Sequence, residues 1–278
     1  MTVGASAESR KFLWLGCAIL LVFISAGSLV TIAGTTLLKT RTIPFQPPSV
    51  THLLGTDDMG YDILASLLAA GNLSLAIGVS AALISVIIGT VAGMLAGFLE
   101  RPWAGVATGA IDVVLLIPML PFMMVLAAYL GTQVHNVILA IALIGWCGTA
   151  RAVRARVAQL RETPFIEALE ALGLTRTRIL FYHVLPNVRE VVSAKFVLSV
   201  AGAMLSESAL SFMGLGDPVR MSWGRMVHDA FQRGGFANGL WNWYLPPGLC
   251  ITLCTMGFVF LGLYVEKRSG QTNTTKME

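Results

Sequence analysis

The stretch ILASLLAAGNLSLAIGVSAALISVIIGTVAGMLAGFL, residues 63–99, contains no Asp, Glu, Lys or Arg. A helix needs about 20 predominantly apolar residues to cross the hydrocarbon core of a bilayer, so this stretch is long enough to cross it once. Residues 12–38, 113–150 and 234–265 also lack these four charged residue types. The pattern predicts an integral membrane protein that crosses the bilayer several times.

The composition of the whole chain agrees with a membrane environment. Hydrophobic residues make up 55% of the 278 residues and charged residues 12%, and the mean hydropathy is +0.74. A soluble domain carries about 25% charged residues, so this chain would lack a polar surface in water. Alternating strand patterns are absent, and lipid requires every backbone polar group to be satisfied internally. We therefore expect an all-α, polytopic membrane protein.

Six membrane spans are expected from the positions of the apolar stretches. They are placed near residues 12–34, 71–98, 105–129, 134–150, 189–213 and 244–265. Within the long 113–150 stretch, Pro118 and Pro121 predict a bent helix, followed by a tight turn near 131–136. Arg10 and Lys11 precede the first span as in a secretory signal, but the apolar stretch is too long and lacks a clean cleavage site. We interpret it as an uncleaved first helix.

The distribution of Lys and Arg predicts the orientation. With both termini in the cytoplasm, 14 of the 19 Lys and Arg residues are cytoplasmic and five are external. Positive residues favour the cytoplasmic side, so both termini are predicted to be cytoplasmic. The external segments are then residues 35–70, with a short surface helix around Tyr61–Ala69, and 214–243. Residues 1–70 form a first helix plus external segment, and 71–278 a core domain with one large cytoplasmic loop, 151–188.

The cytoplasmic loop contains a short helix with clear boundaries. Thr163 followed by Pro164 is typical of a helix start, with a capping side chain and a proline at the first helical position. Gly173 is typical of a helix end. The apolar residues predicted to share one side are Phe165, Ile166, Leu169 and Leu172. A helix this short is marginal alone in water, and its apolar face indicates docking into a groove on a partner.

The same loop resembles the EAA loop of ABC-importer permeases: Glu-Ala-Ala, three residues, Gly, nine residues, a position commonly Ile, one more residue, then Leu-Pro. The matching positions here are Glu167, Ala168, Gly173, Leu185 and Pro186. Leu169 stands at the second Ala, and His183 stands at the Ile position. The resemblance implies a type I importer permease fold. It also implies that these residues couple the permease to an ATPase.

Other segments resemble the peptide and nickel branch of these permeases. Residues 52–64 resemble its H-x-L-G-T-D-x-x-G-R-D-x-L segment, with Tyr61 in place of Arg. Residues 207–216 resemble E-x-x-L-S-F-L-G-L-G, and 222–224 follow as Ser-Trp-Gly. Asp112 with Pro118 resembles a D-x(5)-P pattern. Residues 263–268 depart from the usual ending. The resemblance covers residues 50–265, and its motifs do not distinguish dipeptides, oligopeptides and nickel.

The resemblance also implies the partners. A second, homologous permease would complete the pathway, two ATP-binding cassette subunits would bind ATP and magnesium, and an external binding protein would deliver the substrate. Candidate contacts with the binding protein are Asp57, Asp58 and Trp223. The chain itself has no G-x-x-x-x-G-K-[ST] phosphate loop and no nucleophile motif, so we expect no enzyme activity and no cofactor. The net charge of +4 follows from the topology and does not indicate nucleic-acid binding.

Two acidic residues within the predicted spans are candidates for the pathway or its gate. Burying an ionisable side chain inside the membrane costs free energy, so such a residue is first considered as a functional candidate. Glu207 could line the route or latch the external gate, or be held by hydrogen bonds from neighbouring helices. Asp112 is expected to brace a neighbour. An ion-driven secondary transporter, the alternative from another class, would need paired membrane charges or broken helices at matching positions. Cys250 and Cys254 share a helix face, but no His or carboxylate accompanies them, so no metal site is expected.

Overall fold

The computed structural model describes residues 2–32, 41–100 and 102–275. Every regular element of this part of the chain is a helix, and an isolated bridge joins Thr56 to Asp62. Positions 33 and 34 of the first predicted span lie outside the described residues. The elements are α1 (Thr2–Ile32), α3 (Ile63–Phe98), α4 (Trp103–Leu116), α5 (Met119–Leu130), α6 (Val134–Arg161), α7 (Pro164–Ala171), α8 (Arg176–Arg178), the π-helix η1 (Ile179–Val184), α9 (Leu185–Phe212), α10 (Trp223–Gln232) and α11 (Trp241–Thr275).

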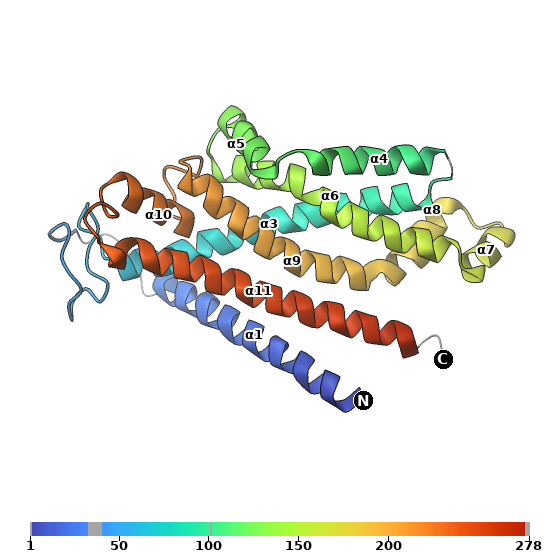
Figure 1. Ribbon diagram of the computed structural model, residues 1–278, viewed down its shortest axis with the longest axis horizontal. Helices are drawn as coiled ribbons and strands as arrows, with labels where there is room; N and C mark the ends of the chain where they lie inside the picture. Colours follow the sequence, from blue (N-terminus) through green and yellow to red (C-terminus); the bar gives the residue numbers. More distant parts are fainter. Residues whose placement is uncertain (1, 33–40, 101, 276–278) are drawn as a thin grey trace.

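The long helices run lengthwise in one bundle (Figure 1). Helix α9 packs against α3, α6 and α11, and α1 packs along α11. The beginning of α1, the end of α11 and helix α7 lie at one end of the bundle, which we call the α7 end. Helix α10 and residues 41–62 lie at the opposite end, which we call the α10 end.

A row of glycines brings α3 and α6 into close contact. Gly89, Gly93 and Gly97 are four residues apart on the face of α3 that meets α6. A Cβ atom on Gly89 would lie only 2.5 Å from the carbonyl oxygen of Trp146. A Cβ atom on Gly93 would lie 2.6 Å from the carbonyl oxygen of Ala150. Small residues at this spacing allow helix backbones to approach in lipid, so the row fixes the position of α6 and of α7 beyond it.

Within the residues that the structure describes, four helices are long and apolar enough to cross a membrane: α1, α3, α6 and α11. The bent pair α4 and α5 makes a fifth span if the two are counted together. The multi-pass, all-helical membrane fold is therefore confirmed, whereas only four or five of the six predicted spans meet this test. The remaining prediction, near residues 189–213, corresponds to α9, whose 28 residues include four charged side chains.

The bend predicted at Pro118 is confirmed as a break between α4 and α5. Helix α4 ends at Leu116, Pro118 takes an extended conformation before α5, and the two helix axes meet at 82°. Proline cannot donate a backbone hydrogen bond, and its ring excludes a continuous helix. Helix α4 has 14 residues, or about 21 Å of length. It is therefore too short to cross the roughly 30 Å hydrocarbon core by itself.

Two boundaries differ from the prediction. The surface helix expected at Tyr61–Ala69 is instead the first part of α3, because the Asp62 side chain accepts a hydrogen bond from the backbone N–H of Ala65 and starts the long helix there. The boundary proposed between residues 70 and 71 thus falls inside α3. Helix α6 continues to Arg161, so the first eleven residues of the predicted 151–188 loop are helical.

Candidate functional site

Helix α7 begins where the sequence predicts, but its first turn is held differently. Pro164 occupies the start of the helix as expected. The predicted side-chain cap by Thr163 is wrong, because the Thr163 hydroxyl donates to the carbonyl oxygen of Leu160 at 2.6 Å and not to the α7 backbone. Helix α6 ends just before this point and offers free carbonyl groups, which compete for the hydroxyl. Thr163 therefore joins the end of α6 to the start of α7.

Gly173 ends α7 in a left-handed conformation, with φ of +75°. The N–H of Gly173 donates to the carbonyl oxygen of Glu170 at 2.9 Å, and the N–H of Leu174 donates to that of Leu169 at 3.2 Å. These two bonds form a Schellman motif, which satisfies the last carbonyl groups of a helix and favours glycine. The helix stop predicted at Gly173 is thus confirmed. The sharp reversal leaves α7 projecting at the end of the bundle (Figure 1).

The apolar residues of α7 are divided between two faces, not gathered on one as predicted. Ile166 is 2% exposed, and Leu169 packs beside it against a core cluster formed by α3, α6, η1 and α9. Phe165 and Leu172 point outward, 49% and 76% exposed. Glu167 and Ala168 are also exposed. One face of α7 is therefore attached to the bundle, while the other leaves two large apolar side chains and a carboxylate exposed.

The other motif residues lie directly behind α7. His183 belongs to η1, and its ring meets that of Phe165 edge to face at 5.9 Å. Leu185 begins α9, and its N–H donates to the carbonyl oxygen of Leu180, five residues earlier. Pro186 follows, without an N–H and with a ring that would crowd a regular α-helix. The wider π-turn accommodates this proline, so η1 forms a continuous join between the region of α7 and α9.

Basic side chains also tie the α7 end together, a feature that the sequence did not reveal. Arg161 donates to the carbonyl oxygen of Leu99 at 2.6 Å, and Arg176 pairs with Glu100. Both bonds hold the region around α7 against the end of α3. The pairing partners are more than 60 residues apart in the chain, so no local pattern could predict them.

At the α10 end, Asp57 organises the turn before α3. Its Oδ1 accepts hydrogen bonds from the N–H groups of Tyr61 at 2.8 Å and Met59 at 2.9 Å. Burial raises the pKa of the Asp57 carboxyl above its ordinary value, although these backbone donors act in the opposite direction. Asp57 is half-buried, and its bonds are internal to the turn. It shapes the segment that carries the neighbouring Asp58.

Asp58 joins this segment to α10. Both of its carboxylate oxygens accept from Nη1 of Arg233, at 3.0 and 3.1 Å. Asp229, 7% exposed, lies 3.6 Å from Arg233 and 3.6 Å from Arg225. These acidic and basic groups alternate around a cavity of about 260 Å³ between α10 and residues 57–66. The network fixes residues 41–62 to α10.

Trp223 lies in the core and not on the surface, so the prediction that it contacts an external protein needs correction. Its side chain is 1% exposed. The indole N–H donates to the carbonyl oxygen of Leu67 at 2.8 Å, and its backbone N–H donates to Ser74 Oγ at 3.1 Å. Phe23 of α1 packs edge to face on its ring. Trp223 thus anchors the start of α10 to α3 and α1.

Glu207 is a buried carboxylate in the last part of α9. It is 1% exposed, and its Oε1 accepts a hydrogen bond from Ser211 Oγ at 2.7 Å. Ser208 Oγ lies 3.5 Å from Oε2. The hydrogen-bonding neighbours of Glu207 are the hydroxyl groups of Ser208 and Ser211 on its own helix and of Ser222 at the start of α10. Among the residues that the structure describes, no Lys, Arg or His forms an ion pair with it.

Asp112 braces two helices, as the sequence suggested. Its Oδ1 accepts from Arg151 Nη2 at 2.6 Å and Nε at 3.2 Å, which joins α4 to α6. Both side chains remain about half exposed. One turn away, Arg154 donates to the hydroxyl of Thr108 at 2.8 Å. The basic cluster at residues 151–156 therefore serves partly to hold α4.

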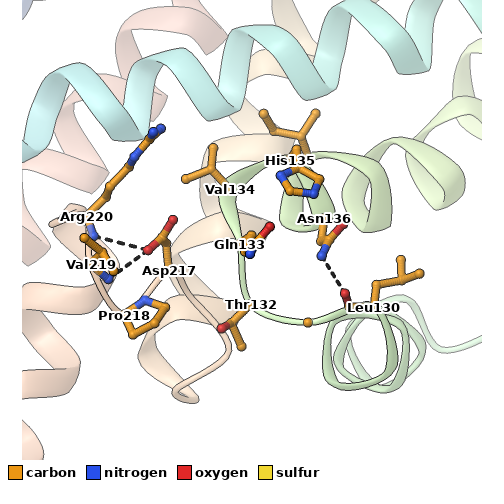
Figure 2. A pocket seen from close by; sticks show the side chains of 12 residues that line it. Leu130, Thr132, Gln133, Val134, His135, Asn136, Asp217, Pro218, Val219 and Arg220 are labelled. Carbon is orange, nitrogen blue, oxygen red and sulfur yellow. Dashed lines mark hydrogen bonds between the residues drawn. The ribbon is translucent and has the colours of Figure 1, made fainter.

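A cavity of about 760 Å³ opens at the α10 end, between the α5–α6 turn and the α9–α10 loop. Figure 2 shows Gln133, His135 and Arg220 around it, with the carboxylate of Asp217 between them. Asp217 Oδ1 accepts from the N–H of Val219 at 2.8 Å and so shapes the loop. The cavity lies far from α7, so the two ends of the bundle have separate candidate sites.

The described part of the chain shows no group of three His, Cys, Asp or Glu side chains that could hold a metal ion. Cys250 and Cys254 are free thiols on α11, and Cys254 is fully buried. Their environment is apolar, since both belong to a core cluster with aromatic and aliphatic neighbours. The arrangement fits small buried hydrophobic residues.

Fold and sites together define a class: a multi-pass helical membrane protein with a short, partly exposed helix between two long helices. Comparison with known families matches residues 89–270 to the family described as binding-protein-dependent transport system inner membrane component. This match covers more than half of the chain, including α7 and Glu207. The chain belongs to this family, whose members are membrane permeases of ABC importers.

Individual relatives agree with the family. The chain is 36% identical to the dipeptide transport system permease protein DppC of Alkalihalophilus pseudofirmus over 219 residues, which is 78% of this chain and 71% of that protein. It is 32% identical to the oligopeptide transport system permease protein OppC of Bacillus subtilis, over 78% of this chain and 70% of that protein. The OppC protein of Haemophilus influenzae is 33% identical, over 76% and 68%.

Proposed function

We propose that this chain is one of two permease subunits in an ABC importer for di- or oligopeptides. The observation that carries the proposal is α7: a short helix of the family motif that buries Ile166 and presents Phe165 and Leu172 outward. Membership of the family and the names of the relatives support transport, and those names favour peptides over nickel. An ion-driven secondary transporter is less consistent with a family that depends on binding proteins.

The exposed face of α7 would dock in a groove of an ATP-binding cassette subunit, with ATP and magnesium bound there. Apolar anchors with a polar neighbour are typical of helix-in-groove recognition. We call α7 in this role the coupling helix, and the ATP-binding cassette subunit the cassette. A homologous permease would bring a second coupling helix and a second cassette. The excess of Lys and Arg around α7 supports its location in the cytoplasm, with both termini on that side of the inner membrane. The shared position of α7 with the two ends of the chain in Figure 1 is consistent with this orientation.

The α10 end would then face outward and receive substrate from an external binding protein. Asp57 and Asp58 are candidate contacts with the binding protein, since the neighbouring side chain of Met59 is exposed. Asp112 and Glu207, the two acidic candidates for the pathway or its gate, are each held by side chains of this chain, which favours a role in positioning helices over contact with the substrate. ATP binding would close the cassettes, draw the two coupling helices together and open the cavity outward, and hydrolysis would reset it. This is an alternation between two states, biased by the nucleotide.

The experiment is uptake of a radiolabelled dipeptide and a labelled oligopeptide by proteoliposomes that contain both permeases, both cassettes and the binding protein. Glu167→Ala should lower uptake about tenfold or more, as expected when the charged contact of the docked face is lost, and should reduce co-purification of the cassettes. Glu170→Ala is the matched control, because Glu170 is exposed on α7 but stands outside the family motif. If the wild-type importer takes up neither the dipeptide nor the oligopeptide, the proposed substrate is wrong. Unchanged cassette binding in Glu167→Ala would contradict the docking role.

A further inference from the structure

The serines around Glu207 extend its hydrogen-bond network from α9 to α10. Ser211 Oγ donates to Glu207 Oε1 at 2.7 Å and accepts from Ser222 Oγ at 3.4 Å. Ser222 is the N-cap of α10, where its Oγ accepts from the N–H of Arg225 at 3.3 Å. A buried carboxylate is costly unless it is hydrogen-bonded, so this chain of hydroxyl groups is the means by which Glu207 is accommodated. The same chain connects the end of α9 with the beginning of α10.

Backbone packing brings α10 close enough for this connection. A Cβ atom on Gly224 would lie 2.6 Å from Ser208 Cα and 2.9 Å from Ser211 Cβ. Only a glycine at this position lets the first turn of α10 rest directly on α9. In the Ser-Trp-Gly sequence, Ser222 therefore caps α10, Trp223 anchors it in the core, and Gly224 allows its close contact with α9.

Helix α10 in turn holds residues 41–62 through the ion pair between Arg233 and Asp58. At its other end, α9 is continuous with η1 and so with the region behind α7. Its 28 residues span about 42 Å. One helix therefore joins the region of the proposed coupling helix to the network that positions α10 (Figure 1).

We infer that Glu207 is a positioning residue that holds α10 to α9, so that the α10 end moves with α9 during transport. The inference rests on the proposed function, because the movement would originate at α7. Glu207 acts here as a hydrogen-bond acceptor for Ser211. This role requires no contact with the peptide, which separates it from that of a residue lining the pathway.

The test compares Glu207→Gln, Glu207→Ala and Ser211→Ala in proteoliposomes of the full importer. Glutamine keeps a carbonyl oxygen for Ser211, so Glu207→Gln should retain uptake within about twofold, whereas the two alanine variants should raise the ATP hydrolysed per imported peptide about tenfold, as expected for a lost buried acceptor or donor. Ser206→Ala is the matched control, since Ser206 lies on the same helix outside the network. A loss of stability alone would lower uptake and ATP hydrolysis together and leave their ratio unchanged.

Hydrogen exchange of residues 222–232 provides a second readout that needs no substrate. Glu207→Ala and Ser211→Ala should accelerate exchange of these backbone amides, and Glu207→Gln and Ser206→Ala should not. Unchanged exchange in both alanine variants would overturn the inference, even if the importer proved to carry another substrate. A loss of uptake in Glu207→Gln confined to cationic peptides would also overturn it, because Glu207 would then act through its charge. Failure of wild-type peptide uptake would contradict only the proposed function.

Discussion

The two ends of the bundle are built in different ways. At the α7 end, a short helix is attached through the buried side chain of Ile166, and large apolar residues on its other face remain exposed. At the α10 end, another short helix is fixed on several sides by polar groups, with Ser222 against α9, Trp223 against α3 and Arg233 against Asp58. One end leaves large apolar side chains exposed, and the other is largely held by contacts within the chain itself.

This difference indicates how movement would divide between the ends. An apolar attachment has no fixed direction and allows α7 to tilt with whatever holds its outer face. A hydrogen-bonded network holds only one geometry, so α10 follows the helix to which it is bonded.

The largest effect is expected at the buried attachment of α7. Ile166→Ala should lower the free energy of unfolding by about 2–5 kcal/mol, since it removes buried methyl groups and leaves a cavity. Leu172→Ala, on the exposed face of the same helix, should change it by less than about 0.5 kcal/mol. Thermal unfolding in detergent measures both. Equal effects of the two variants would mean that α7 has no preferred inner face.

The next effect concerns the charged network at the α10 end. Arg233→Met keeps the length of the side chain but leaves the carboxylates of Asp58 and Asp229 without this partner, at an expected cost of about 1–3 kcal/mol. Residues 41–62 should then be cleaved faster by an added protease. Arg220→Met provides the control, because that exposed arginine lies at the same end outside the network. Equal cleavage of the Arg233 variant and wild type would show that other contacts hold this segment.

A smaller effect is expected at the end of α7. Gly173→Ala places a Cβ atom on a residue with φ of +75°, which costs about 1–2 kcal/mol. Gly239, also at positive φ but in the loop before α11, offers a matched position at the other end. Gly173→Ala should weaken cassette co-purification, whereas Gly239→Ala should not. If both variants bind the cassettes equally, the shape of the α7 turn has no part in docking.

The smallest effect is expected for the brace between α4 and α6. Arg151→Gln should change the free energy of unfolding by less than about 1 kcal/mol, because exposed ion pairs contribute little. Uptake should remain near the wild-type value. A strong loss of uptake without a loss of stability would instead place Asp112 and Arg151 in the pathway.

Several features of the fold follow directly from the sequence because their causes are local. Charged residues are costly in lipid, so the charge-free stretch 63–99 corresponds to the long helix α3. A proline inside a helix interrupts it, and the break before α5 is found at Pro118. Gly173 ends α7 because its left-handed conformation is costly for other residues. Each of these depends on one or a few neighbouring residues.

The rest depends on contacts between distant parts of the chain. The pattern of apolar residues in α7 groups Phe165 with Ile166, but the cluster around Ile179 buries Ile166 and part of Leu169 and leaves Phe165 exposed. Trp223 stands in a segment predicted to be external, which favours contact with another protein, yet its indole N–H is bonded in the core to the carbonyl oxygen of Leu67. The α3 glycines at spacing four were a readable signal for the contact with α6. The roles of the site residues remain predictions.

Photo-crosslinking from α7 to the cassette subunits tests the account most directly. A photo-crosslinking amino acid is placed at Leu172, at the buried Ile166, or at Val219 near the opposite end, and the importer is illuminated in membranes that take up peptide. Docking of the exposed face of α7 on a cassette predicts a crosslink to a cassette from position 172 and none from positions 166 and 219. A transport-competent importer with no cassette crosslink from position 172, or with a crosslink from position 219, would contradict it.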